Sequence, residues 1–276
     1  MLYRLVFLLI PFLGMCRPAG AQAPPAAETQ VLQKASRLML GRKYESAFKL
    51  LNGFDPRHRR PGIVLRQTEL ALTYYLRSRE YEAFGFRDLG PLERLDSLRV
   101  RYTRAAIPYP FAVETVLKTL LKRYPTNYKL NRALADYYYQ VQQCECAEAD
   151  KSPSTLLALI ARHYTIVHAH GLGDYRSYYA LGYARMSQGR FAESVPLFKR
   201  AIALRPNYAL AHFNLAYSYN ELKQLPQARE AARSAARLFG TAEPQMSSDA
   251  VFMAEDIERR LGATTDVSSG KKPLHP

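Results

Sequence analysis

Apolar and small side chains recur every three to four positions through residues 175–208, and the same pattern returns through residues 209–242. This spacing places them on one face of an α-helix. An offset of 34 residues superimposes the two stretches, a period typical of stacked helix-turn-helix units. The matching positions are Leu181 with Leu215, Tyr183 with Tyr217, Ala201 with Ala235 and Leu204 with Leu238. We therefore expect an all-α chain of at least three stacked units, because one helix pair buries too little apolar surface alone.

The repeated pattern resembles the tetratricopeptide repeat, in which aromatic and small residues occupy fixed positions of each helix pair. In residues 175–208 those positions hold Tyr178, Leu181, Gly182, Phe191, Ser194, Phe198, Ala201 and Pro206. Residues 209–242 keep Leu215, Ala216, Tyr219, Ala228, Ala232 and Ala235, but have His212 for the first aromatic residue and Gly240 for the proline. The resemblance implies a superhelical array of antiparallel helix pairs, a tetratricopeptide-like α-solenoid that binds other proteins.

Weaker copies of the pattern precede these units. Leu134 matches Leu181 at a distance of 47 residues, which is one period plus an insertion of 13. Residues 125–174 are therefore expected to form a repeat with an inserted loop at 144–154, between helices at about 127–143 and 155–170. Ser154 is the expected N-cap of the second of these helices.

The first part of the chain carries the pattern in a more degenerate form. The turn sequence that begins at Gly41 is similar to the one that begins at Gly189, and Arg79 to Tyr81 form another candidate turn. We expect residues 24–124 to hold degenerate helical repeats.

The pattern also predicts how the array ends. Val251, Phe252, Ala254, Ile257 and Leu261 lie on one side of a helix at about 248–261, with Gly262 as its stop. Residues 243–262 are thus expected to form a C-terminal capping helix. Residues 263–276 have no hydrophobic period and are expected to be a disordered tail.

Residues 1–23 have the features of a secretory signal peptide. Arg4 supplies the positive start, residues 5–13 the short apolar run, and Ala21 and Ala23 a small-x-small cleavage site. A second interpretation is a bacterial lipoprotein lipidated at Cys16, although Met15 fits that motif poorly because a small residue normally precedes the cysteine. Both interpretations predict an exported protein, periplasmic or secreted, or anchored to a membrane if lipidated.

Positive charge gives a second possible class of partner. The formal net charge is +15, which in a cytoplasmic protein would suggest nucleic acid. Because the chain is expected to be exported, no nucleic acid partner is expected, and an anionic polymer of the cell envelope is the alternative to a protein partner. The densest basic run, Arg57 to Arg60, is expected in a loop, where it serves either solubility or anion binding.

Cysteines and histidines give little sign of a metal site. In an oxidising compartment, Cys144 and Cys146 could form a disulfide with each other. The sequence leaves open whether this disulfide forms. His168 and His170 lie at the far end of the following helix, about 20 Å from the cysteines at 1.5 Å per residue. We expect no metal and no cofactor.

Motifs of enzymes are missing from the sequence. It contains no phosphate-binding Gly-Lys-Ser loop, no Gly-x-Ser-x-Gly elbow and no His-Glu-x-x-His pair. Gly171 and Gly173 lack the third glycine of a dinucleotide-binding loop. We expect a protein without catalytic activity.

A stripe of side chains on the first helix of each clear unit has no assigned role in packing. At 100° per residue it lies nearly opposite the packing face. The resemblance places this stripe on a concave groove that binds partner peptides, whereas the alternative is that its aromatic rings complete the core. Its members are Arg176, Tyr179, Tyr183 and Met186, then Phe213, Tyr217 and Asn220, with Lys129, Arg132, Asp136 and Tyr139 at matching positions upstream. The function predicted is a non-catalytic scaffold or adaptor in the bacterial cell envelope.

Overall fold

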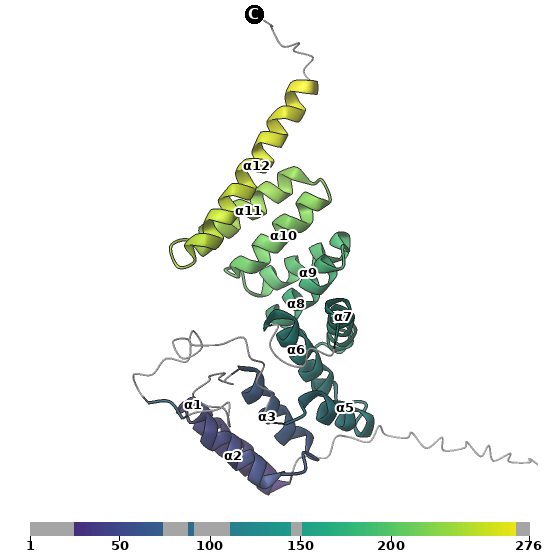
Figure 1. The fold of residues 1–276 in the computed structure, drawn as a ribbon, viewed down its shortest axis with the longest axis vertical. Helices are drawn as coiled ribbons and strands as arrows, with labels where there is room; N and C mark the ends of the chain where they lie inside the picture. Colours follow the sequence, from purple (N-terminus) through teal and green to yellow (C-terminus); the bar gives the residue numbers. More distant parts are fainter. Residues whose placement is uncertain (1–24, 74–87, 91–110, 145–150, 269–276) are drawn as a thin grey trace, which may run out of the picture.

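The computed structural model describes residues 25–73, 88–90, 111–144 and 151–268. Eleven α-helices run through these residues and stack along the long axis of the molecule, from α1 near one end to α12 at the other (Figure 1). They are α1 (Ala26–Leu40), α2 (Tyr44–Phe54), α3 (Pro61–Thr73), α5 (Val113–Arg123), α6 (Tyr128–Cys144), α7 (Pro153–Ala169), α8 (Tyr175–Ser187), α9 (Phe191–Leu204), α10 (Ala209–Glu221), α11 (Leu225–Phe239) and α12 (Pro244–Ser268). The expected all-α array is confirmed.

Consecutive helices pack as pairs, α1 with α2, α6 with α7, α8 with α9 and α10 with α11, and α12 covers α11. Helix α3 follows the α1 and α2 pair and contacts α1, α2, α5 and α6, so it takes the place of the first helix of a further unit. The candidate turn at Arg79 to Tyr81 and most of the insertion after Cys144 lie outside the described residues.

The turns inside three of the pairs share one conformation. Arg42, Gly189 and Lys223 have φ angles of 60°, 74° and 60°, and each lies two residues before the second helix of its pair. In each turn the next residue donates its N–H to a carbonyl five residues earlier, as in the bond of 2.9 Å from Arg190 to Arg185. The similarity of the turn at Gly41 to the turn at Gly189 is thus structural, but Arg42 rather than Gly41 adopts the left-handed conformation.

Small residues allow the helices of a pair to approach closely. A Cβ atom added to Gly182 of α8 would lie 2.8 Å from the ring of Phe198 in α9, and that ring is fully buried. Between pairs, the buried hydroxyl of Ser194 donates a hydrogen bond of 2.8 Å to Ser218. Leu181 and Leu215, which the repeat pattern assigns to the core, are only 5% and 7% exposed.

Two helix boundaries differ from those expected. Helix α12 begins at Pro244 and continues to Ser268, so residues 263–268 are helical rather than part of a disordered tail. Gly262 does not end the helix because it is not among the residues with positive φ, whereas Gly240, with φ of 49°, ends α11. The N-cap of α7 is Ser152 instead of Ser154, because Pro153 suits the first helical position and the Ser152 hydroxyl accepts the N–H of Thr155.

Replacing Gly182 with alanine tests the close approach. Alanine normally favours a helix by about 1 kcal/mol over glycine, but here its methyl group would clash with a ring that has no room to move. We expect Gly182→Ala to lower the free energy of unfolding by about 1 to 3 kcal/mol in urea denaturation. Gly53 of α2 is the matched control, because its added Cβ would meet nothing within 4 Å. If both variants gain stability, the helices are not held at this distance.

Candidate binding groove

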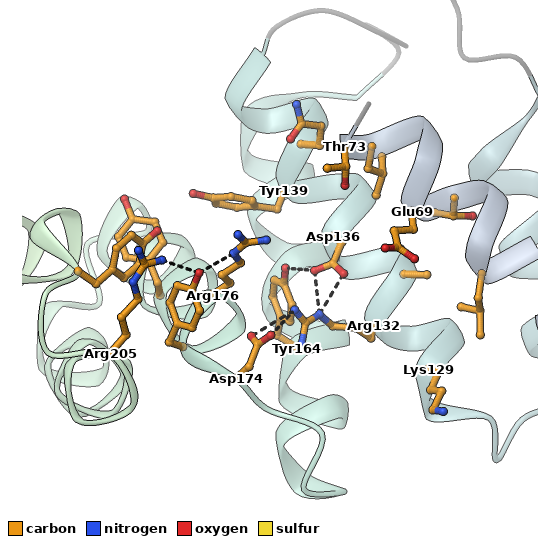
Figure 2. A pocket seen from close by; sticks show the side chains of 18 residues that line it. Glu69, Thr73, Lys129, Arg132, Asp136, Tyr139, Tyr164, Asp174, Arg176 and Arg205 are labelled. Atoms are coloured by element: carbon orange, nitrogen blue, oxygen red, sulfur yellow. Dashed lines mark hydrogen bonds and ion pairs between the residues drawn. The ribbon is translucent and has the colours of Figure 1, made fainter. Parts of the chain in front are cut away.

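A groove of about 810 Å³ runs across the first helices of three successive pairs (Figure 2). Helices α3, α6 and α8 form most of it, with one tyrosine from α7 and the connection between α9 and α10 closing one end. Its lining side chains are Leu65, Thr68, Glu69, Leu72 and Thr73, then Lys129, Arg132, Ala133, Asp136, Tyr139, Gln140 and Tyr164, then Asp174, Tyr175, Arg176, Tyr179, Arg205 and Tyr208.

Helix α6 shows why these side chains reach the groove. Lys129, Arg132, Asp136 and Tyr139 recur every three or four residues and therefore lie on one face. Leu130, Leu134, Tyr137 and Val141 lie on other faces and are at most 6% exposed. Burial of these residues against neighbouring helices orients the polar face of α6 toward the groove.

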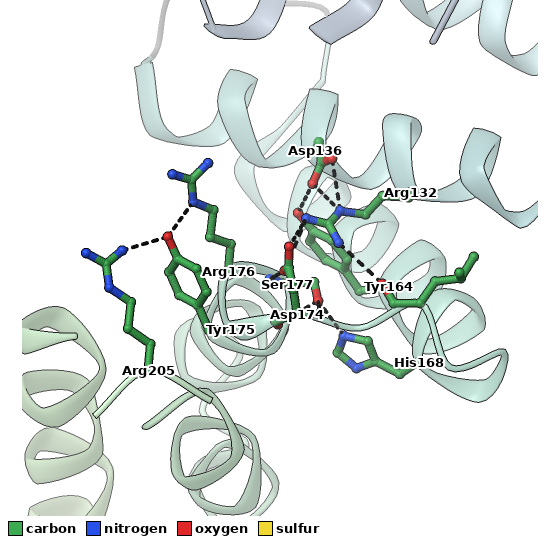
Figure 3. A network of polar contacts seen from close by, with 10 residues as sticks. Arg132, Asp136, Tyr164, His168, Asp174, Tyr175, Arg176, Ser177 and Arg205 are labelled. Atoms are coloured by element: carbon green, nitrogen blue, oxygen red, sulfur yellow. Dashed lines mark hydrogen bonds and ion pairs between the residues drawn. The ribbon is translucent and has the colours of Figure 1, made fainter. Parts of the chain in front are cut away.

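Arg132 is the centre of a polar network at the floor of the groove (Figure 3). Its Nε donates to both carboxylate oxygens of Asp136, at 2.9 and 3.0 Å, and its Nη2 lies 3.2 and 3.1 Å from those of Asp174. Tyr164 donates a hydrogen bond of 2.6 Å to Asp136. The network joins α6, α7 and the N-terminus of α8, so it holds two helix pairs together.

The network leaves its charges paired. Burial opposes ionisation of Asp174, but the backbone N–H of Ser177 and the guanidinium of Arg132 outweigh it, so the pKa of Asp174 is lowered. Removal from water raises the pKa of Asp136, and the charge and hydrogen bonds of Arg132 offset this in part. Between two carboxylates, Arg132 has a raised pKa despite its own burial and stays charged. Both carboxylates are thus held by Arg132.

Two histidines of α7 form hydrogen bonds close to this network, with residues of α8 and α6. His168 lies 3.0 Å from the hydroxyl of Ser177, which is part of the capping box of α8, and His163 lies 3.0 Å from the side-chain oxygen of the buried Asn131. Burial lowers the pKa of each imidazole to about 4, with nearby cations adding to the effect. Both are therefore neutral at pH 7.

Tyrosine rings form one wall of the groove. The rings of Tyr179 and Tyr208 are 4.9 Å apart, and those of Tyr175 and Tyr208 are 5.3 Å apart. Tyr179 is only 6% exposed, and its hydroxyl accepts a hydrogen bond of 3.0 Å from Asn214. Burial raises the pKa of Tyr208 to about 12 and also raises that of Tyr139, so both hydroxyls stay protonated at neutral pH.

Two arginines meet at one end of this wall. Arg176 Nε and Arg205 Nη1 donate to the hydroxyl of Tyr175 at 2.9 and 2.6 Å, and the guanidinium of Arg205 lies 4.8 Å from the centre of that ring (Figure 3). Among the described residues, neither arginine has a carboxylate within ion-pair distance. The Tyr175 hydroxyl holds both guanidiniums in place, and they remain available to an anionic group.

The sequence-predicted stripe divides between this groove and other surroundings. Arg176 and Tyr179 line the groove, together with the upstream residues at matching positions. Tyr183 is half-buried against Tyr139 at 6.0 Å, Met186 packs on the core, and Phe213 lies 6.2 Å from Phe239. Tyr217 is 40% exposed beside Phe191, and Asn220 accepts a hydrogen bond from Arg260. These five residues do not line the groove.

Sequence reasoning missed several groove residues. Tyr175 and Arg205 lie 30 residues apart, at the two ends of one helix pair. An antiparallel pair brings its last residues back beside its first, and this property of the repeat could have brought these two together. The contribution of α3 had no such signal because the pattern is degenerate there.

Metal binding finds no support in the described part of the chain, where no three His, Cys, Asp or Glu side chains are grouped to hold an ion. Cys146 lies outside the described residues, and the pairing of Cys144 with it stays open.

Comparisons with known proteins agree with the fold. A family model described as tetratricopeptide repeat matches residues 179–243. Among solved structures, a point mutant of MamA is 20% identical over 77% of this chain and 97% of its own, with a TM-score of 0.51. MamA from Desulfovibrio magneticus RS-1 is 14% identical over 78% of this chain and 97% of its own, also with a TM-score of 0.51. No curated protein sequence matches the chain.

Residues 179–243 therefore match tetratricopeptide repeats, and most of the chain shares the helical-repeat fold of the MamA structures. Such arrays serve in general as scaffolds for protein-protein interaction, through the extended concave surfaces that stacked repeats create. They are typically non-enzymatic.

The buried histidines predict a dependence of stability on pH. Their pKa is about 4 in the folded state and 6.5 when unfolded, so the unfolded chain binds more protons between these values. The stability they contribute is present above pH 6.5 and is lost as the pH falls toward 4. We expect His163→Asn, which keeps a hydrogen-bond donor, to reduce this loss by about 1 to 3 kcal/mol in urea titrations at several pH values. An unchanged pH dependence would mean that His163 is not held neutral by burial.

Proposed function

We propose that the chain is a non-catalytic scaffold or adaptor that binds a peptide or segment of a partner protein in the groove. The main observation behind this proposal is the groove, which has a volume of about 810 Å³ and is shared by the first helices of three successive pairs. A partner held there contacts all three pairs at once, which suits an extended segment.

The chemistry of the groove fits a protein segment. Tyrosine combines a large apolar ring with a hydroxyl, and it loses little conformational entropy on binding because its rotamers are few. Tyr208 keeps its proton, so its hydroxyl can donate to a carbonyl of a bound backbone. Arg176 and Arg205 suit an acidic side chain at one end of that segment.

The balance of charge favours a protein over an anionic polymer in the groove. Glu69, Asp136 and Asp174 share the lining with Lys129, Arg132, Arg176 and Arg205. A polyanion would meet carboxylates along the floor, and like charges at close range disfavour such binding. A protein segment needs to be acidic only at the Arg176 end.

The proposed setting is the bacterial cell envelope. Support comes from the apolar run and small-x-small site within residues 1–23, which lie outside the described part of the chain. Among the described helices, none is both long and apolar enough to cross a membrane. N-terminal sequencing of the mature protein tests the setting, because cleavage after Ala23 gives a chain that begins at Pro24, whereas lipidation gives an acylated Cys16.

Photo-crosslinking tests the groove. A photoreactive residue at Gln140, which lines the groove, should crosslink a discrete partner in whole cells, and the same group at Arg237, exposed on α11, should not. With the partner in hand, Arg176→Ala combined with Arg205→Ala should weaken binding at least about tenfold, because charge-assisted hydrogen bonds are lost. Thermal unfolding should change little, since both arginines are exposed.

The matched control is Tyr217→Ala, which removes a large exposed side chain away from the groove and should leave affinity unchanged. Equal loss of affinity in this variant would place the partner elsewhere on the array. Loss of all binding between about 0.1 M and about 0.5 M salt would instead favour an anionic polymer, because aromatic contacts resist salt.

A further inference from the structure

A second cationic pocket, of about 420 Å³, lies outside the groove. Its lining includes four arginines, Arg57, Arg59, Arg60 and Arg123, together with Asp55 and Tyr124. The first three arginines belong to the loop between α2 and α3, whereas Arg123 is the last residue of α5. The fold thus adds a guanidinium from a distant part of the sequence to the basic run.

The loop is held in a fixed conformation. Asp55 is 5% exposed, and its carboxylate accepts the backbone N–H groups of Arg59 at 3.0 Å and Arg60 at 2.8 Å. Its carbonyl accepts the N–H of His58, which has a φ of 50°. The carboxylate of Asp55 is therefore occupied by backbone N–H groups of the loop. These hydrogen bonds order the loop before any ligand binds.

Among the described residues, three of the four arginines have no carboxylate partner. Arg60 pairs with Glu28 at 3.1 Å, but within the described residues Arg57, Arg59 and Arg123 form no ion pair. Arg123 lies 5.6 Å from the centre of the Tyr124 ring, which restricts its position. The N-terminus of α3 follows directly after Arg60 and adds partial positive charge. Bringing like charges together costs energy that a bound anion would offset.

We propose that this pocket binds a phosphate-class oxyanion, either a free phosphate or the headgroup phosphate of a lipid. A guanidinium presents a planar fork of N–H donors that matches phosphate oxygens. Three unpaired guanidiniums offer more donors than the two oxygens of one carboxylate can accept, whereas a phosphate monoester offers three oxygens and nearly two negative charges. The site is separate from the groove, and it does not depend on the partner proposed there.

Calorimetry of the full chain with inorganic phosphate is the direct test. Phosphate should bind and also raise the midpoint of thermal unfolding, whereas chloride at matched ionic strength should not. Arg57→Gln, Arg59→Gln and Arg123→Gln should each weaken phosphate binding by about tenfold. Arg237→Gln removes the same charge from α11, where the Arg237 side chain donates a hydrogen bond to Ser234, and the variant should bind phosphate as the unchanged protein does.

Vesicles distinguish the two sources of phosphate. Co-sedimentation with vesicles that contain phosphatidic acid, whose headgroup is a phosphate monoester, but not with phosphatidylcholine vesicles, reversed by inorganic phosphate and lost in Arg123→Gln, identifies a lipid headgroup. Binding of inorganic phosphate without vesicle binding identifies a free phosphate.

Three results would overturn the proposal. One is the absence of phosphate binding at low salt in the unchanged protein. Another is unchanged affinity in all three pocket variants while their thermal midpoints show that they are folded. The third is an equal loss of affinity in Arg237→Gln, because binding would then follow net charge and not the pocket. None of these results bears on the crosslinking experiment at the groove.

Discussion

The close packing of helix against helix is the constraint on which the rest of this array depends. Gly182 lets the ring of Phe198 lie against the backbone of α8, and the buried hydroxyls of Ser194 and Ser218 link one pair to the next. These contacts hold α8 against α9 and α9 against α10. Helix α8 and the connection between α9 and α10 line one end of the groove, so the packing of these helices sets the shape of that end.

Polar contacts also fix the positions of the helices relative to one another. Arg132 extends from α6 to Asp174 at the start of α8 and is held in turn by Asp136, which Tyr164 of α7 also contacts. Such half-buried ion pairs give little net stability, because removal of the charges from water cancels much of their attraction. Their effect is on geometry, since three helices must be correctly placed for the network to close. A groove with a fixed floor loses less entropy when a partner binds.

The parts of the structure that could be predicted are those where the sequence repeat is clear. Residues 175–242 carry the pattern strongly, and their helices, their turn at Gly189 and the core positions Leu181 and Leu215 follow from it. Periodicity gives the angle of a side chain around its own helix but not the neighbour that covers it. Tyr179 lies on the side that was expected to be open, yet Phe198 and Tyr208 bury it. Gly262 shows the same limit, because the sequence does not tell whether a glycine adopts the positive φ that ends α11 at Gly240 and is absent at Gly262.

Charge illustrates the difference between composition and structure. A net charge of +15 attracts anions in general but names no site. Pairing removes some candidates, since Arg190 pairs with Glu193, and both Arg229 and Arg233 pair with Glu258. Among the cations without an ion pair in the described residues, two groups line pockets. Arg176 and Arg205 lie beside the ring of Tyr175 in a groove that several tyrosines line, where aromatic contact can sustain binding in salt, whereas four arginines and the single ring of Tyr124 line the second pocket. We therefore expect anion binding in the second pocket to depend more steeply on salt than partner binding in the groove.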